Sequence, residues 1–218
     1  MKISGILFDL DGTLINTWDL YMEVYRMLLQ PYVRKTLTPQ DIANSKPTPE
    51  RQFIELTVPA KERDHAYKRF LSHYAHFYDT LSKGQYPGIK DMLGRIRNAD
   101  YPMGIVTGKS RPAWEITARK EAFGDFDVVI TDSDVEHYKP HGEGLKKACH
   151  LLSLDHNEVL YIGDNLMDHH VAYEAGTQFA ASCWAKSAEE KKDFLEQARR
   201  IGIRHFLHQP GELFQMLD

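Results

Sequence analysis

Short apolar runs alternate along the chain with amphipathic segments, a pattern typical of strands and helices in an α/β protein. Several runs are apolar at every position, as expected of parallel strands that are covered by helices on both faces. We expect strands over residues 3–8, 103–106, 128–130, 159–162, 179–183 and 203–207. The pattern therefore predicts a doubly wound parallel sheet, a Rossmann-like α/β core.

Between these runs, apolar residues recur at the spacing of one helical face. The spacing i, i+3, i+4, i+7 occurs twice, at Ile89, Met92, Leu93 and Ile96 and again at Leu145, Ala148, Cys149 and Leu152. Pro112 stands where a first helical residue belongs, and Gly176 follows a helical segment as a C-terminal glycine would. These signals predict helices that connect the strands.

Residues 16–83 break the alternation, because they contain helical patterns and no convincing strand. Two apolar stripes stand out, one at Tyr21, Val24, Tyr25, Leu28 and Leu29, and one at Ala66, Phe70, Tyr74, Phe77 and Tyr78. Thr38-Pro39 and Thr48-Pro49 each resemble an N-cap followed by a helical proline. We expect residues 16–83 to form a helical cap domain, with Trp18 in its core. Residues 1–15 and 84–218 would form the α/β core.

The composition is that of an ordinary globular protein and excludes several classes. The 218 residues are 42% hydrophobic and 27% charged, which argues against long disorder and collagen-like repeats. No apolar run approaches the roughly 20 residues that a membrane-spanning helix needs. The opening segment is broken by Asp9 and Asp11, unlike a secretory signal. The only cysteines, Cys149 and Cys183, lie in apolar segments, so we expect buried, reduced thiols in a cytoplasmic protein.

The net charge of −4 argues against tight binding to nucleic acid, which depends on clustered Lys and Arg. An anionic substrate would instead need a local positive site.

Polar residues follow three of the expected strands, at the carboxyl ends where open α/β sheets bind their ligands. Asp9 and Asp11 follow the first strand, Thr107-Gly108 the second, and Asp164 the fourth. Carboxylates two residues apart can also be turn caps. Their recurrence at several strand ends nevertheless favours a shared site.

These motifs resemble, in order, those of the haloacid dehalogenase superfamily. The matching segments are Phe8-Asp9-Leu10-Asp11-Gly12-Thr13-Leu14, Thr107-Gly108-Lys109, Lys139-Pro140, and Gly163-Asp164 with Asp168. Tyr86-Pro87-Gly88 and the segment ending Ala175-Gly176 resemble the phosphoglycolate phosphatase-like branch. The resemblance spans essentially the whole chain, and it implies a hydrolase that acts on a phosphorylated small molecule.

The resemblance implies a role for each matched residue. Asp9 would be the nucleophile that forms an aspartyl-phosphate, and Asp11 would be the general acid and base. Mg²⁺ would be held by Asp9, Asp11 and Asp164, since it prefers oxygen ligands. Phosphate would be bound by the following residues: Thr107, Gly108 and Lys139.

Other candidates are less distinctive. Asp168 could be a second metal ligand, an outer partner of the site or an acid at a helix N-terminus. Lys46 and Arg51 are candidates for substrate contacts in the cap, although loop charges are commonly just solvated. His169-His170 is not expected to hold zinc, because adjacent residues point in different directions on a helix. The helical neighbours His73 and His76 are not expected to hold it either, because no carboxylate or cysteine completes a tetrahedral set. His169 occupies a position that is usually apolar in the resembling family.

The sequence predicts a Mg²⁺-dependent phosphatase of a small phosphomonoester, with phosphoglycolate as the family-level substrate. Inorganic pyrophosphate is the alternative substrate. A sugar-phosphate mutase of the β-phosphoglucomutase type is a second enzymatic possibility, and a phosphate-binding regulatory module is the non-enzymatic one. No membrane or nucleic-acid partner is expected, and the sequence does not specify an oligomeric state.

Overall fold

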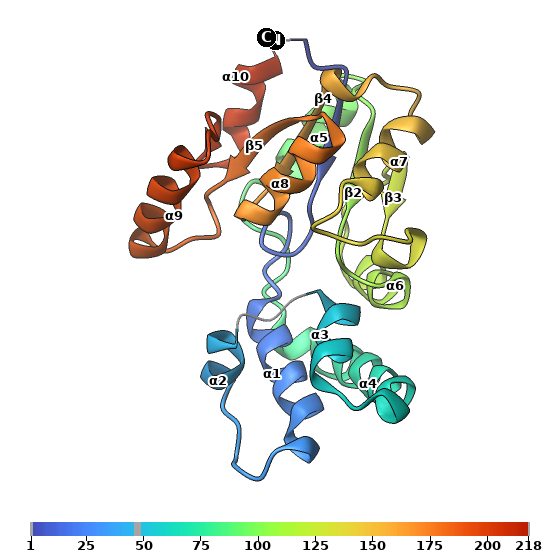
Figure 1. Ribbon diagram of the computed structural model, residues 1–218. Helices are drawn as coiled ribbons and strands as arrows, with labels where there is room; N and C mark the ends of the chain where they lie inside the picture. Colours follow the sequence, from blue (N-terminus) through green and yellow to red (C-terminus); the bar gives the residue numbers. More distant parts are fainter. Residues whose placement is uncertain (1, 46–48, 218) are drawn as a thin grey trace. The chain divides into compact units, whose positions relative to one another are not determined.

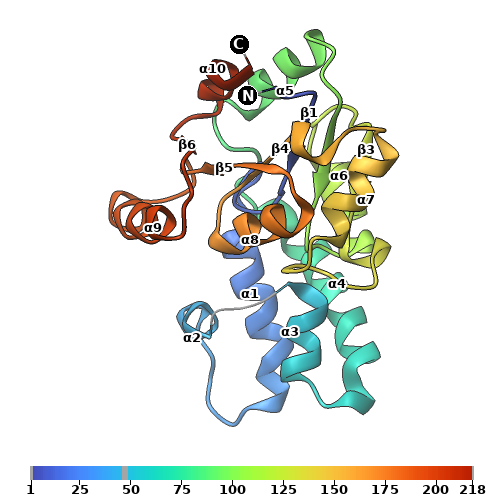
Figure 2. The ribbon, with the colours of Figure 1, turned by 45° about the horizontal axis from the view of Figure 1, so that its top comes forward.

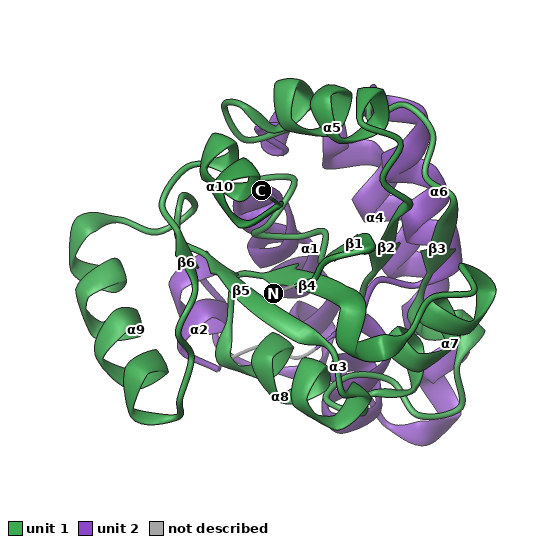
Figure 3. Cartoon of the chain, turned by 90° about the horizontal axis from the view of Figure 1, so that it is seen from above, with its two compact units in different colours: residues 1–16, 85–107, 123–218 green, residues 17–84, 108–122 purple. Residues whose placement is uncertain are grey.

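The computed structural model describes residues 2–45 and 49–217. The chain divides into two compact units, shown in Figure 3. Unit 1 comprises Met1–Asn16, Gln85–Thr107 and Phe123–Asp218, and unit 2 comprises Thr17–Gly84 and Gly108–Ala122. The sequence pattern assigns all of residues 84–218 to the core, whereas the packing groups residues 108–122 with the helical insert. Whether the units act as catalytic core and cap stays a prediction.

Unit 1 is built on a six-stranded parallel sheet in the order β3-β2-β1-β4-β5-β6. The strands are β1 (Gly5–Phe8), β2 (Met103–Val106), β3 (Val128–Ile130), β4 (Val159–Gly163), β5 (Gln178–Ser182) and β6 (Phe206–Leu207). The direction in which strands are added to the sheet reverses between β1 and β4. Both neighbours of β1, which are β2 and β4, therefore come from later parts of the chain. The predicted doubly wound α/β core is confirmed, and the reversal places the crevice for ligands at the end of β1.

Helices cover both faces of this sheet, as the view along the strands shows (Figure 3). The helices α7 (Glu143–Leu151) and α8 (Leu166–Ala175) lie on one face, and α5 (Ile89–Asn98) and α10 (Phe214–Leu217) lie on the other. A further helix, α9 (Ala188–Arg200), precedes β6. Cys149, in α7, and Cys183, directly after β5, are free thiols buried in the same core cluster. Gly176 ends α8 in the left-handed conformation, as predicted.

The last strand is shorter than predicted. The apolar run predicts a strand over residues 203–207, but only Phe206–Leu207 pairs with β5. The chain is still closing α9 at Ile203, whose N–H donates to the carbonyl of Ala198 after a left-handed Gly202. A backbone donor that completes a helix end cannot also serve the sheet ladder.

Unit 2 is helical, and its longest helix is α4 (Figures 1 and 2). The helices are α1 (Trp18–Leu29), α2 (Pro39–Asn44), α3 (Glu50–Thr57), α4 (Arg63–Leu81) and α6 (Arg111–Lys120). The two predicted stripes meet here, because Tyr25 and Phe70 stack with ring centroids 5.8 Å apart. Helix α6 belongs to the same cluster through Ala113, which explains why residues 108–122 join this unit.

The two Thr-Pro signals in unit 2 differ in how well they predict a helix start. Thr38 caps α2 with a reciprocal capping box, followed by Pro39, as predicted. At the second signal Thr48 lies outside the described residues, and Pro49 occupies the N-cap position of α3 instead of the first helical position. Proline lacks a side-chain acceptor, so this helix begins without a side-chain cap.

Trp18 was predicted to lie in the core of the insert, and this prediction is wrong. It is the first residue of α1 and is 57% exposed. A residue in the first turn lies at the margin of a helical layer, where fewer neighbouring side chains can reach it than at the middle of the same apolar stripe.

Along the described chain, residues 2–45 and 49–217, we find no helix that is both long enough and apolar enough to cross a membrane.

Candidate active site

Asp9 lies at the carboxyl end of β1, where the strand order reverses. Its backbone N–H donates to the carbonyl of Ile162 at 2.8 Å, which extends the β1–β4 ladder by one residue. Its side chain is buried, and Oδ1 accepts a 2.6 Å hydrogen bond from Nζ of Lys139. A carboxylate at this position is therefore held by the sheet and paired with a cation.

The side chain of Lys139 contacts acidic and phenolic groups from three parts of the chain. Its buried Nζ donates to Asp9, to Oδ1 of Asp168 at 2.8 Å, and to the hydroxyl of Tyr161. Tyr161 in turn donates to the carbonyl of Val106 at 3.0 Å. Since three acceptors surround one ammonium, the orientation of Lys139 is determined by the fold. Sequence reasoning missed Tyr161, which falls inside a buried apolar strand without any motif.

Asp164 follows β4 and lies against the loop that carries Asp11 and Gly12. A Cβ at Gly12 would stand 2.7 Å from Oδ2 of Asp164, and Gly12 has φ +84°. Only glycine tolerates both conditions, so Gly12 permits the close approach of the carboxylate to the backbone. On its other side Asp164 meets Nζ of Lys186 at 3.4 Å. Lys186, which follows β5, was also missed, because a lone lysine in a loop gives no signal.

The side chain of Asp168 contacts both Lys139 and the first turn of α8. Its Oδ1 accepts from Lys139, and its Oδ2 accepts from the backbone N–H of Asn165 at 3.3 Å, in the reciprocal capping box that starts α8. Because both oxygens have protein partners, the structure favours the role of a residue that orients Lys139. It also confirms that Asp168 is a helix N-terminal acid.

Burial and crowding of negative charge shift the pKa values here. Burial raises the pKa of Asp9 well above its ordinary value, with Asp168 and Asp164 adding to the effect and Lys139 opposing it. The pKa of Asp164 is likewise raised, mainly by burial. Burial alone would lower the pKa of Lys139, but Asp168 and Asp9 outweigh it and the net shift is upward. Lys139 therefore stays positively charged, whereas this one ammonium does not neutralise all of the ionised carboxylates around it.

The residues present fit a hard divalent cation. Asp9, Asp164 and Asp168 each offer a carboxylate oxygen, and these oxygens lie within 4.8 Å of one another. The donors are all oxygens, which Mg²⁺ prefers. The raised pKa values of Asp9 and Asp164 show that further positive charge would be accommodated. The cluster contains Asp168 where the sequence analysis expected Asp11; metal ligation by Asp11 stays a prediction.

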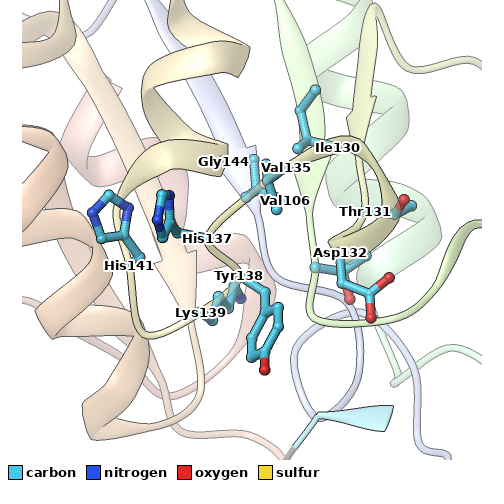
Figure 4. Close-up of a pocket in the computed structure, with 11 residues that line it drawn as sticks. Val106, Ile130, Thr131, Asp132, Val135, His137, Tyr138, Lys139, His141 and Gly144 are labelled. Atoms are coloured by element: carbon cyan, nitrogen blue, oxygen red, sulfur yellow. The ribbon is translucent and has the colours of Figure 1, made fainter. Parts of the chain in front are cut away.

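Thr107 and Lys139 line a common pocket at the ends of β2 and β3, shown in Figure 4. The backbone N–H of Thr107 donates to the carbonyl of Ile130 at 3.0 Å, so the sheet positions this residue directly after β2. Asp132, which is 2% exposed, lines the same pocket. The pocket thus combines a hydroxyl, a buried carboxylate and an ammonium.

Residues 6–182 match the family of haloacid dehalogenase-like hydrolases. The chain belongs to this family.

The chain is similar to curated proteins and to solved structures. It is 35% identical to pyrophosphatase PpaX of Bacillus thuringiensis (strain Al Hakam) over 186 residues, which cover 84% of this chain and 85% of the relative. It is also 35% identical to PpaX of Anoxybacillus flavithermus, over 87% of this chain and 88% of the relative. The crystal structure of a "putative phosphoglycolate phosphatase" from Lactobacillus plantarum superposes with a TM-score of 0.81 at 26% identity, covering 99% of this chain and 100% of that one. These comparisons, together with the family match, show an enzyme of the phosphatase type.

The remaining candidates of this haloacid dehalogenase-like hydrolase belong to unit 2. Lys46 lies outside the described residues, and Arg51 is an exposed residue of α3. Gly108 begins the second segment of unit 2, directly after Thr107. A Cβ at Gly108 would stand 3.0 Å from Pro49, so a side chain at this position would crowd the start of α3.

Residues 109 and 110 are held inside unit 2 by a buried polar network. Nζ of Lys109 donates to the hydroxyls of Tyr21 at 2.6 Å and Tyr74 at 2.8 Å. The carboxylate of Glu50 accepts from Tyr21 and from the backbone N–H of Ser110 at 3.1 Å. Although the sequence marked Lys109 as part of a motif, its burial among tyrosines became visible only in the structure.

The structure shows the surroundings of the two histidine pairs noted in the sequence. The ring of His169 packs edge-on against Phe179 with centroids 5.4 Å apart, and burial together with His170 lowers its pKa. His169 therefore packs as an aromatic ring at this position. We did not expect His73/His76 or His169-His170 to hold zinc. Among residues 2–45 and 49–217, neither pair belongs to a group of three close metal ligands.

Proposed function

We propose that this haloacid dehalogenase-like hydrolase is a Mg²⁺-dependent phosphatase that hydrolyses a small phosphomonoester of the phosphoglycolate kind through an aspartyl-phosphate. The observation that carries the proposal is the position of Asp9. It combines a place at the sheet's reversal point, a 2.6 Å contact to Lys139, and neighbouring carboxylates. A carboxylate so placed can act as a nucleophile toward phosphorus.

In the first proposed step, an oxygen of Asp9 attacks phosphorus and the bond to the leaving oxygen breaks. Asp11 gives its proton to that oxygen, which leaves as an alcohol. In the second step, Asp11 takes a proton from water as the water oxygen attacks the phosphorus of the aspartyl-phosphate. Inorganic phosphate leaves, Asp9 regains its carboxylate, and Asp11 regains its proton.

The other residues stabilise charge on the phosphoryl group. Thr107 would donate its hydroxyl and Gly108 its backbone N–H to phosphoryl oxygens, while Lys139 supplies a buried positive charge beside Asp9. Asp9 and Asp164, with Asp11, would hold Mg²⁺. When bound, the ion neutralises phosphoryl oxygens and lowers their repulsion of the attacking carboxylate. Lys46 and Arg51 of the helical unit are proposed contacts of the organic part of the substrate.

The decisive test is release of phosphate from a panel of phosphorylated metabolites and pyrophosphate, with Mg²⁺ and with EDTA. We expect turnover of a small phosphomonoester that needs Mg²⁺. The proposal fails if no phosphorylated compound is turned over, or if turnover continues undiminished in EDTA. Trapping of a phosphorylated Asp9 peptide by rapid quench would identify the nucleophile directly.

Inorganic pyrophosphate is a second candidate substrate, and one specific observation favours it. The curated relatives named pyrophosphatase PpaX are 35% identical to this chain over most of its length. In that case Asp9 would attack one phosphorus of pyrophosphate and the other phosphate would leave. The panel separates the two candidates by their ratio of kcat/KM, since that ratio measures discrimination between substrates.

The same assays distinguish a hydrolase from a mutase and from a regulatory module. A mutase would move phosphate between positions of a labelled sugar phosphate without net release of phosphate. A regulatory module would bind phosphorylated compounds without turnover. Either outcome would replace the hydrolase proposal.

A further inference from the structure

The segment between β3 and α7, together with the first residue of α7, carries a group of side chains that the proposed phosphatase reaction does not use. His137, His141 and Glu143 each present one ligand atom, and the three atoms lie within 4.8 Å of one another. Nδ1 of His137 is 3.0 Å from Oε2 of Glu143, and the two imidazole rings are 5.0 Å apart between centroids. Figure 4 shows both rings side by side on this segment.

Glu143 is held in place before any ligand arrives. Its two carboxylate oxygens accept hydrogen bonds from the backbone N–H groups of Glu136 and His137, each at 2.9 Å. A carboxylate oxygen has lone pairs beyond the one used by each donor, so ligation does not require these bonds to break. One ligand is therefore preorganised, and the segment is folded around it.

The two imidazoles need only small rotations to complete a site. Ligands bound tetrahedrally at about 2.1 Å lie about 3.4 Å apart, against a present spread of up to 4.8 Å. The side chain of His137 is 67% exposed. Nδ1 of His141 accepts from the backbone N–H of Glu143 at 3.2 Å, and ligation through that atom would replace this hydrogen bond.

We propose that His137, His141 and Glu143 form a binding site for a transition-metal ion of the zinc class. Imidazole is a ligand that Zn²⁺, Ni²⁺ and Cu²⁺ favour, whereas Mg²⁺ prefers oxygens only. The site is thus chemically distinct from the carboxylate cluster of Asp9, Asp164 and Asp168. Water would fill the remaining position, since three protein ligands leave a tetrahedral site open.

A metal ion bound at this site would restrain the segment that carries Lys139. Lys139 lies between His137 and His141 in the sequence, and its Nζ reaches Asp9. An ion bound by both histidines ties together the chain on either side of Lys139. Binding would therefore slow exchange of the backbone amides of residues 136–139 and 141–143 and leave the amides of the sheet unaffected.

Titration calorimetry with ZnCl₂ in excess MgCl₂ tests the proposal, because Mg²⁺ occupies the hard-cation site. We expect one-to-one binding to the wild-type protein and an affinity reduced by at least about tenfold in His137→Ala and in His141→Ala. His170→Ala is the matched control, since His170 and Glu174 form an exposed pair with a 3.7 Å contact; its affinity should equal that of the wild type. Thermal unfolding of each variant confirms that it is folded.

A spectroscopic measurement identifies the ligands independently. The EPR spectrum of bound Cu²⁺ should show nitrogen coupling from two imidazoles in the wild type and from one in either histidine variant. Undetectable binding, or binding and spectra unchanged in both variants, would overturn the proposal. The Asp9→Asn protein should bind Zn²⁺ normally while lacking turnover, so failure of the zinc site and failure of the proposed phosphatase reaction are distinguishable.

Discussion

Nζ of Lys139 lies 2.6 Å from Oδ1 of Asp9, although the two residues are 130 positions apart in the sequence. Asp9 directly follows the first strand, and Lys139 comes from the segment between the third strand and α7. The contact brings a cation to a carboxylate whose pKa is raised by burial, and the cation opposes that shift.

Replacing Asp9 with Asn removes the proposed nucleophile with almost no change in shape. We expect phosphate release in Mg²⁺ to fall by at least about a thousandfold, as when other covalent catalysts lose their nucleophile. The protein should remain folded, because Lys139 keeps its bond to Asp168. Steady-state assays and thermal unfolding measure the two effects. The exposed Asp155 offers the control Asp155→Asn, and equal activity of the two variants would refute the assignment of Asp9.

Replacing Lys139 with Met leaves two buried carboxylates, Asp9 and Asp168, without their cation. We expect kcat to fall by about 10²–10³-fold and the free energy of unfolding by about 3–5 kcal/mol. Urea denaturation measures the second effect. The double variant Lys139→Met/Asp168→Asn removes one of the unpaired charges and should recover part of the stability. If it is less stable than the single variant, the charge explanation is wrong.

Two substitutions at Asp168 separate its roles. Asp168→Asn keeps an oxygen that can cap α8 but removes the charge that orients Lys139, and Asp168→Ala removes both. We expect both variants to lose about 10–100-fold in kcat. Only the alanine variant should also lose the roughly 1 kcal/mol of a helix cap. Wild-type kcat in Asp168→Asn would show that Lys139 does not need this partner.

Stability should depend on pH and Mg²⁺ through Asp164. Its pKa is raised in the folded protein, so between about pH 3.9 and that raised value the folded state binds more protons than the unfolded state. Its contribution to stability therefore falls as pH rises through this window. In EDTA, Asp164→Asn should gain stability relative to the wild type as pH rises from 4 to about 7.

Addition of Mg²⁺ should reverse that order, because a ligand that binds only the folded wild type stabilises it by mass action. Thermal unfolding with EDTA and with MgCl₂ at each pH measures both effects. A wild-type melting temperature that Mg²⁺ leaves unchanged would count against a metal site at Asp164.

The tyrosines around Lys109 should contribute to the stability of unit 2. The buried hydroxyl of Tyr74 accepts from Lys109 and lies 3.0 Å from Oγ1 of Thr117. Tyr74→Phe removes an acceptor from a buried ammonium, and we expect a loss of about 1–3 kcal/mol in the free energy of unfolding. Tyr173, which is 77% exposed, supplies the control Tyr173→Phe, expected within about 0.5 kcal/mol of wild type. Equal effects would contradict the burial argument.

The sheet and much of the candidate site were predictable because their signals are local. The strands β2 and β3 were predicted to the residue, since buried parallel strands are continuous apolar runs. Asp9, Thr107 and Asp164 follow such runs, and parallel strands bring their carboxyl ends to one edge. Lys139 was identified only through the family resemblance, because a lysine in a segment without periodicity carries no signal of its own.

Other features depended on long-range packing. Tyr161 lies in a strand and Lys186 in a loop, and nothing in their surroundings in the sequence indicates that they contact Lys139 and Asp164. The exposure of Trp18 was wrongly predicted, since periodicity identifies the face of a helix but not how far the neighbouring layer extends. The grouping of α6 with the helical unit likewise depends on its packing in the cluster that contains Tyr74.

The sequence by itself determined the α/β class, the helical insert and the acids at the strand ends, because hydrophobic period and strand-end position are properties of neighbouring residues. Only the tertiary structure decided which cation meets which acid. Asp168 lies close to Asp164 in the sequence, in the first turn of α8, yet it pairs with Lys139, 29 residues away. That choice depends on the order of the strands and on the burial that makes an unpaired charge unfavourable.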